Sequence, residues 1–171
     1  MKKDKIRIGC GAGFSGDRIE PALILAEQGE LDYLVLECLA ERTIALAQKR
    51  KLQDASKGYD PLLEKRIKSL LPLLVKNQIK LITNMGAANP LAAAQKVIEI
   101  AKELNLSIKV AAVTGDDATQ WVKNSSTHFT VLENGQALND YEVISINAYM
   151  GVEGILEALT ADAQIIITGR V

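Results

Sequence analysis

Apolar residues along this chain follow two patterns that alternate from one end to the other. Short apolar runs bounded by glycine are typical of buried parallel strands, and they predict strands at residues 6–10, 32–37, 80–84, 108–113 and 164–168. Longer stretches of helical period predict helices at residues 18–29, 39–53, 61–77, 90–104 and 151–160. This alternation predicts an α/β fold, a Rossmann-like parallel sheet with helices on both faces.

Residues 128–147 interrupt the alternation. Asn134-Gly135 lies between two runs rich in β-forming residues, at 129–132 and 141–146. Because Asn-Gly between such runs favours a tight hairpin turn, we expect a β-hairpin excursion near residues 128–147. In the helix expected at 61–77, Pro72 should kink or split the helix, since proline has no backbone N–H to donate.

The chain length of 171 residues is enough for one compact core. We therefore expect a single α/β domain over residues 1–171. The last apolar strand is followed only by Gly169-Arg170-Val171, whereas a parallel sheet normally has helices on both faces. We expect the chain to be the N-terminal part of a longer protein.

Charge and cysteine content narrow the class of partner. With 20 basic and 21 acidic residues, the net charge of -1 gives no field that would attract nucleic acid or anionic lipid. No apolar run approaches the roughly 20 residues that span a bilayer. Cys10 and Cys38 are expected to be buried free thiols at strand ends. Together these features indicate a cytoplasmic protein with a small-molecule ligand and neither nucleic acid nor membrane as a partner.

Candidate chemistry lies directly after the expected strands. In an open parallel sheet, ligands bind beyond the carboxyl ends of the strands. The small or polar residues at those positions are the candidate ligand-binding residues: Gly11, Gly13, Ser15, Gly16, Glu37, Asn84, Gly86, Asn89, Thr114, Gly115 and Arg170. Residues 147–151 join them if the hairpin returns to the same edge. Asp17, Asp116 and Asp117 are the candidate general acids or bases.

The glycine-rich turn after the first strand is the sharpest of these motifs. Gly11-x-Gly13-x-x-Gly16 matches the dinucleotide fingerprint, and Glu37 stands about 20 residues further on, where a ribose acceptor is expected. Against NAD, Asp17 brings a negative charge to the place of the pyrophosphate, and Asp17 is also a good helix N-cap. The turn therefore indicates a phosphate-bearing ligand and leaves NAD(P) and CoA open as cofactors.

The remaining polar residues have ordinary structural interpretations beside the functional ones. Asn89-Pro90 fits the N-cap and first position of a helix, and adjacent Asp116-Asp117 also suits a helix start. An aspartate pair alone provides too few ligands for Mg²⁺, so no metal site is predicted. His128 is the only histidine, and we expect it to be structural.

Several motifs in order carry a resemblance to a known family. They are the segments from Ile8 to Arg18, Asp32 to Thr43, Thr83 to Pro90, Val113 to Asp117 and Ile167 to Val171. In these segments the chain resembles the N-terminal domain of the acyclic terpene utilisation family. The resemblance implies a role in the bacterial breakdown of acyclic isoprenoids such as citronellol and geraniol, through branched acyl-CoA thioesters. Members of that family are longer than this chain, and the resemblance transfers no set of catalytic residues.

Three functions stay open at this point. The leading hypothesis is a protein of isoprenoid and branched acyl catabolism that binds a phosphate-bearing small molecule, such as an acyl-CoA, at the strand ends. The second is an NAD(P)-dependent oxidoreductase that uses the glycine turn. The third is a non-catalytic subunit or scaffold of a larger catabolic assembly, and a homo-oligomer fits any of the three. Whether the chain is an enzyme is left open.

Overall fold

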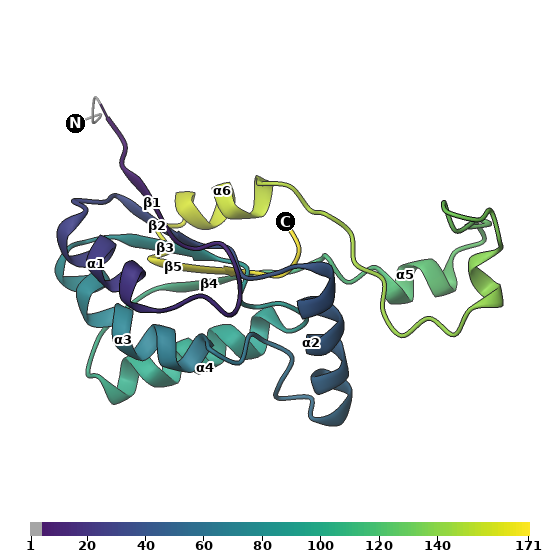
Figure 1. The fold of residues 1–171 in the computed structure, drawn as a ribbon, viewed down its shortest axis with the longest axis horizontal. Coiled ribbons are helices and arrows are strands. Elements are labelled where there is room, and N and C mark those ends of the chain that lie inside the picture. Colours follow the sequence, from purple (N-terminus) through teal and green to yellow (C-terminus); the bar gives the residue numbers. More distant parts are fainter. Residues whose placement is uncertain (1–4) are drawn as a thin grey trace.

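The computed structural model describes residues 5–171 and contains one five-stranded, all-parallel sheet (Figure 1). The strands lie in the order β1-β2-β3-β5-β4 and are β1 (Ile8–Ala12), β2 (Tyr33–Leu36), β3 (Lys80–Thr83), β4 (Val110–Val113) and β5 (Ile165–Thr168). The helices are α1 (Glu20–Gln28), α2 (Glu41–Gln53), α3 (Leu63–Lys76), α4 (Pro90–Glu103), α5 (Thr119–Asn124), α6 (Glu153–Thr160) and the 3-10 helix η1 (Leu138–Asp140). The α/β class and the parallel sheet are as the alternation predicts.

The helices form a layer on each side of the sheet. Helices α1, α3 and α4 cover one face, and α6 covers the other face over β4 and β5 (Figure 1). The main core lies under the three-helix layer, where inward side chains such as Leu34 and Leu81 pack with Leu70. Strand β5 is buried along its whole length, as expected for a central parallel strand.

Strand β1 differs from the sequence prediction in ways that change the glycine motif. It runs from Ile8 to Ala12, so Gly9 and Gly11 belong to the strand and the turn proper begins at Gly13. A Cβ at Gly11 would come within 2.8 Å of Ala22 in α1 and of Leu36 in β2, so this glycine allows close helix-strand packing. The expectation that Cys10 is buried is wrong, because the outer face of β1 carries no helix and Cys10 is exposed there.

The excursion between β4 and β5 projects from the body at the right of Figure 1. Its turn at Asn134-Gly135 is present, closed by the Val131 N–H donating to Gln136 O at 2.8 Å. Pairing is limited to one antiparallel bridge, Thr130–Ala137, so the expectation of two strands, at 129–132 and 141–146, is wrong. After that bridge the chain turns through η1, and the Tyr141 hydroxyl bonds back to the turn, so residues 141–146 make no ladder with residues 129–132.

Two smaller features of the helices complete the comparison with the sequence. Helix α3 continues through Pro72 without a split, with Leu71 and Leu74 buried on either side of it. The packing of this helix against the sheet outweighs the lost backbone hydrogen bond. Among the described residues, no helix has the length and apolar character that crossing a membrane would need.

Candidate functional site

The carboxyl ends of β2 and β3 are joined by a bridge of polar side chains. Asn84, just after β3, accepts a hydrogen bond from the Cys38 N–H at 2.7 Å and donates one to Glu37 Oε1 at 2.9 Å. Glu37 Oε1 also accepts from the Leu39 N–H at 3.0 Å. These side chains therefore fix the chain as it leaves β2, and they do so at the edge where the sequence places a ligand.

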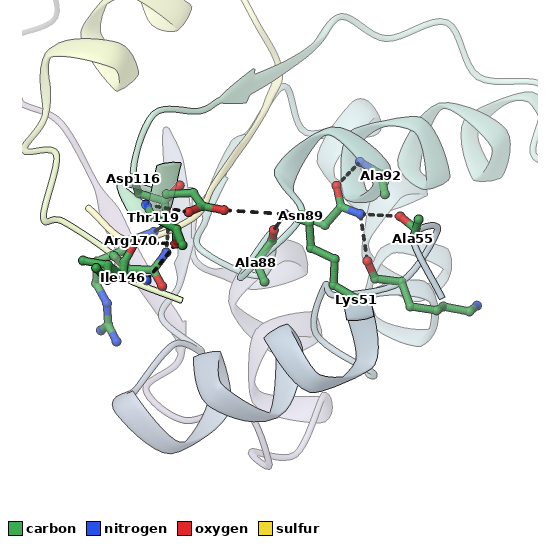
Figure 2. A network of polar contacts seen from close by, with 12 residues as sticks. Lys51, Ala55, Ala88, Asn89, Ala92, Asp116, Thr119, Ile146 and Arg170 are labelled. Carbon is green, nitrogen blue, oxygen red and sulfur yellow. Dashed lines mark hydrogen bonds and ion pairs between the residues drawn. The ribbon is translucent and has the colours of Figure 1, made fainter. Parts of the chain in front are cut away.

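Strand β5 brings Arg170 to the same edge, and the chain after β5 is held by Asp116. The Arg170 N–H donates to Asp116 Oδ2 at 2.9 Å, and Asn147 Nδ2 donates to the same oxygen at 3.1 Å. Asp116 lies so close to Gly169 that a Cβ there would come within 2.5 Å of Oδ2. Hydrogen bonds thus join the residues after β4 to those after β5 (Figure 2).

The guanidinium of Arg170 points across this edge toward α2. It donates to Leu39 O at 3.1 Å, lies 3.9 Å from Glu41 Oε1 and stacks 5.0 Å from the ring centre of Tyr149. The residue is only 9% exposed, so its charge is held in place with little contact with solvent. Within residues 5–171, Leu39 O is the only atom that accepts a hydrogen bond from this guanidinium, so most of its five donors stay available.

A pocket of about 280 Å³ opens beside Arg170, at the ends of β2, β3 and β5. Its floor is apolar, with Val35, Ile82 and Ile155 from two strands and α6. The polar residues that line it come from four separate segments and are Glu37, Thr83, Asn84, Tyr149, Thr168 and Arg170. The volume is near the lower end of the range for small-molecule sites.

Charge at the mouth of the pocket is balanced by Glu41 at the start of α2. The hydrogen bond from its own backbone N–H lowers the pKa of Glu41, and the nearby Arg170 guanidinium lowers this pKa further. The Tyr149 hydroxyl also donates to Glu41 Oε1 at 3.4 Å. Glu41 is exposed, so it stays ionised at neutral pH and tethers the outer side of Arg170.

The glycine turn is a separate structure, closed by its own aspartate. Asp17 accepts a hydrogen bond from the Gly13 N–H at 2.8 Å, whereas α1 begins later, with Ile19 at its N-cap position. The expectation that Asp17 caps the helix is therefore wrong, since its carboxylate caps the turn. The hollow beside the turn is lined by Gly11, Gly13 and Gly16 and does not include Arg170.

A buried arginine holds the turn from below. Arg66 of α3 donates to Ser15 O at 3.0 Å and to Asp17 O at 2.8 Å, and its other terminal nitrogen lies 3.1 Å from the Cys38 sulfur. Ser15 bonds in turn to the buried Asp60. Burial raises the pKa of the Cys38 thiol to about 12, although Arg66 alone would lower it. Cys38 is therefore neutral and packed.

The other predicted residues act as caps and tethers (Figure 2). Asn89 caps α4 through the Ala92 N–H at 3.3 Å, as expected, and its amide donates to Ala55 O at 2.9 Å and Lys57 O at 2.7 Å. Asp117 accepts from the Thr119 N–H at 3.1 Å and lies 3.9 Å from Lys51 Nζ. Asn89 and Asp117 thus fix the loop before α3 and the base of the excursion.

The structure therefore brings together only part of the predicted set. Glu37, Asn84 and Arg170 line one pocket, while Thr114, Gly115, Gly86 and the glycine turn do not line it.

The conditional expectation for residues 147–151 is met, because an antiparallel bridge between Asp117 and Asn147 returns the chain to this edge and Tyr149 reaches the pocket. Sequence reasoning missed Arg66, which lies inside α3 and belongs to no motif, and Glu41, which lies at the start of α2 in the segment from Asp32 to Thr43 without a role that its position indicates. Among residues 5–171, no three His, Cys, Asp or Glu side chains gather closely enough to hold a metal ion.

Comparison with known proteins adds one match. A family model described as acyclic terpene utilisation family protein AtuA matches residues 6–171, nearly the whole chain. No curated protein and no solved structure matches the chain at a significant level.

Proposed function

The chain belongs to the acyclic terpene utilisation family, and from this we propose that it binds an anionic branched acyl compound in the pocket beside Arg170. The leading form of this ligand is the CoA thioester of an acyclic isoprenoid acid. Family membership supports a role in acyclic terpene utilisation, and the site geometry supports the choice of pocket.

The observation that carries the proposal is the combination of an apolar floor with a fixed cation. Val35, Ile82 and Ile155 offer aliphatic surface for a branched hydrocarbon. Arg170 stands at the rim with unused donors, and a guanidinium suits the planar oxygens of a carboxylate or the oxygens of a phosphate. A ligand with a hydrocarbon body and an anionic end satisfies both halves of the pocket.

The polar bridge at the rim gives this ligand an orientation. Asn84 and Glu37 are held by their bonds to each other and to backbone amides, and both line the pocket with hydrogen-bonding capacity that these bonds do not use up. A thioester carbonyl or a hydroxyl group near them would be held at the same edge as the anionic end. Asp17, Asp116 and Asp117 hold backbone amides, and their catalytic role stays a prediction.

The oxidoreductase hypothesis has less support from this geometry. A dinucleotide at the glycine turn would have to displace the Asp17 carboxylate from the Gly13 N–H. Its ribose would compete with Leu39 and Asn84 for Glu37. The acyl pocket needs no such rearrangement.

A thermal-shift titration separates the hypotheses. The chain is titrated with a branched C10 acid, its CoA thioester, CoA alone, NAD and NADP. A ligand at 100 times its Kd should stabilise the fold by about 2.7 kcal/mol. We expect the branched thioester to raise Tm most. A shift with NAD alone would favour the oxidoreductase, and no shift with any of the five would favour the scaffold.

Two matched variants test whether the ligand binds in this pocket. Ile82→Phe fills the pocket floor and should abolish the shift with the branched thioester. Ile24→Phe adds the same volume to an exposed position of α1 and should leave the shift unchanged. An unchanged shift in Ile82→Phe would move the ligand to another site.

A further inference from the structure

The excursion between β4 and β5 carries an apolar surface that its own chain does not cover. Residues 119–146 form an arm that stands away from the sheet and its helices (Figure 1). Leu132 is 96% exposed and Trp121 is 66% exposed, and Ile144 is also exposed. Trp121 packs only edge-on against Phe129, with ring centres 5.8 Å apart, so the indole keeps a free face. Three large apolar side chains are thus exposed on one projecting segment, which suits a surface that contacts another protein.

The arm is also acidic. Residues 119–146 contain Glu133, Asp140 and Glu142 against the single basic residue Lys123. The three carboxylates are exposed, and none of them forms an ion pair with another described residue. A surface that fits this arm is therefore both apolar and basic.

Helix α2 presents such a surface. Leu52 is 71% exposed on this helix, and Leu46, six residues earlier, is also exposed, beside the hollow that Ser15 and Asp60 line. Arg42 and Lys49 are exposed on the same side, at spacings of four and three residues from Leu46. Residues 41–57 contain five basic and two acidic residues, so this part of the chain is positive where the arm is negative.

Within one molecule these two surfaces stay apart. The arm leaves the body beside α2 and then extends away from it, so its far end lies well clear of α2 (Figure 1). The base of the arm is fixed in this direction by the Lys51–Asp117 contact and by the bond of the Ala118 N–H to Ile146 O at 2.9 Å. An arm held outward can meet the α2 surface of a neighbouring molecule.

We propose that the arm of one copy, residues 119–146, docks on the outer face of α2 of a second copy, so that the chain forms a two-fold dimer. In a two-fold pair the same contact is made twice, since each copy supplies one arm and one α2 face. Charge complementarity between the arm and α2 selects this partner and this orientation. The proposal is independent of the ligand in the pocket beside Arg170.

Charge reversal with recombination tests the dimer. One variant carries Glu133→Lys and Glu142→Lys in the arm, and the other carries Arg42→Glu and Lys49→Glu in α2. In the homodimer of either variant, the arm and the α2 face carry charge of the same sign at both contacts. A mixed pair instead has one native contact and one with both signs reversed. Dimerisation is measured by sedimentation of the whole chain at low ionic strength, alone and in the equimolar mixture.

We expect the wild type to be dimeric, each variant alone to dimerise at least tenfold more weakly, and the mixture to recover dimers. The control Lys65→Glu with Lys102→Glu changes two exposed lysines on α3 and α4 and should dimerise like the wild type. A monomeric wild type, unaffected homodimers of the two variants, or a mixture that stays monomeric would each overturn the proposal. Circular dichroism of each variant establishes that the comparison is between folded proteins.

Discussion

At the scale of single residues, most polar side chains at the carboxyl edge of the sheet are occupied with holding the chain. Asp17, Asp116 and Asn84 each bond to backbone amides, which is why residue type and position alone cannot separate a ligand-binding residue from a cap. Arg170 differs, because it lies at the rim of a pocket with donors that the protein leaves unused. The sequence places all four at strand ends, and only the contacts distinguish them.

The two cysteines should react very differently. Cys10 is exposed on β1, whereas Cys38 is buried with a pKa of about 12. We expect one thiol per chain to react with a thiol reagent at pH 8, and none in Cys10→Ser until the protein unfolds. The Cys38 thiol has a pKa of 9.0 in the unfolded chain and about 12 in the folded one. The free energy of unfolding should therefore fall as pH increases from about 9 toward 12, because only the unfolded chain loses the proton in this range. Rapid labelling of Cys38 in the folded Cys10→Ser variant would contradict this burial.

Replacing two glycines of the predicted site by alanine should change stability to different extents. A Cβ at Gly86 would come 2.5 Å from Thr168 O and 2.8 Å from Pro90 Cα, both backbone atoms. Gly86→Ala should therefore lower the free energy of unfolding by about 1–3 kcal/mol, measured in urea. Gly13→Ala is the control, since nothing lies within 4 Å of its Cβ position, and it should change stability by less than about 0.5 kcal/mol. Equal effects would mean that close packing does not explain Gly86.

At the scale of elements, the hydrophobic pattern predicts those helices and strands whose formation depends on burying an apolar face. The five strands and the helices at 90–103 and 153–160 follow from the alternation of short apolar runs with stretches of helical period, because these elements pack apolar side chains against the sheet or its helices. The excursion does not follow, since its Asn134-Gly135 turn forms but the next residues make no ladder. A hairpin signal specifies the turn, and pairing also needs a surface on which both strands can pack. Likewise, the glycine turn depends on Arg66 of α3, far away in sequence.

Removing Arg66 should loosen the link between α3 and the glycine turn. Arg66→Met keeps the apolar volume but leaves Ser15 O and Asp17 O without their buried donor. We expect the free energy of unfolding to fall by about 3 kcal/mol in urea denaturation. Arg18→Met, at an exposed position, is the control and should cost less than about 0.5 kcal/mol. If the two variants are equally stable, the buried arginine does not hold the turn.

At the scale of the whole molecule, the strand order explains why residues far apart in the sequence line the same pocket. Strand β5 inserts between β3 and β4, so Arg170 arrives next to Asn84 and Glu37, although it lies at the other end of the sequence. The sequence predicts that these residues share an edge but not which are neighbours, because strand order is a property of the crossovers. The segment that follows the arm adds Tyr149 to the pocket.

The most direct test of the proposed pocket is calorimetric titration of a branched C10 acyl-CoA into the wild type, Arg170→Gln and Arg18→Gln. Arg18→Gln removes an exposed arginine that does not line the pocket. We expect the wild type and Arg18→Gln to bind alike, and Arg170→Gln to lose at least tenfold in affinity while keeping the fold by circular dichroism. Equal affinity in all three proteins would contradict the assignment of Arg170 and its pocket as the binding site.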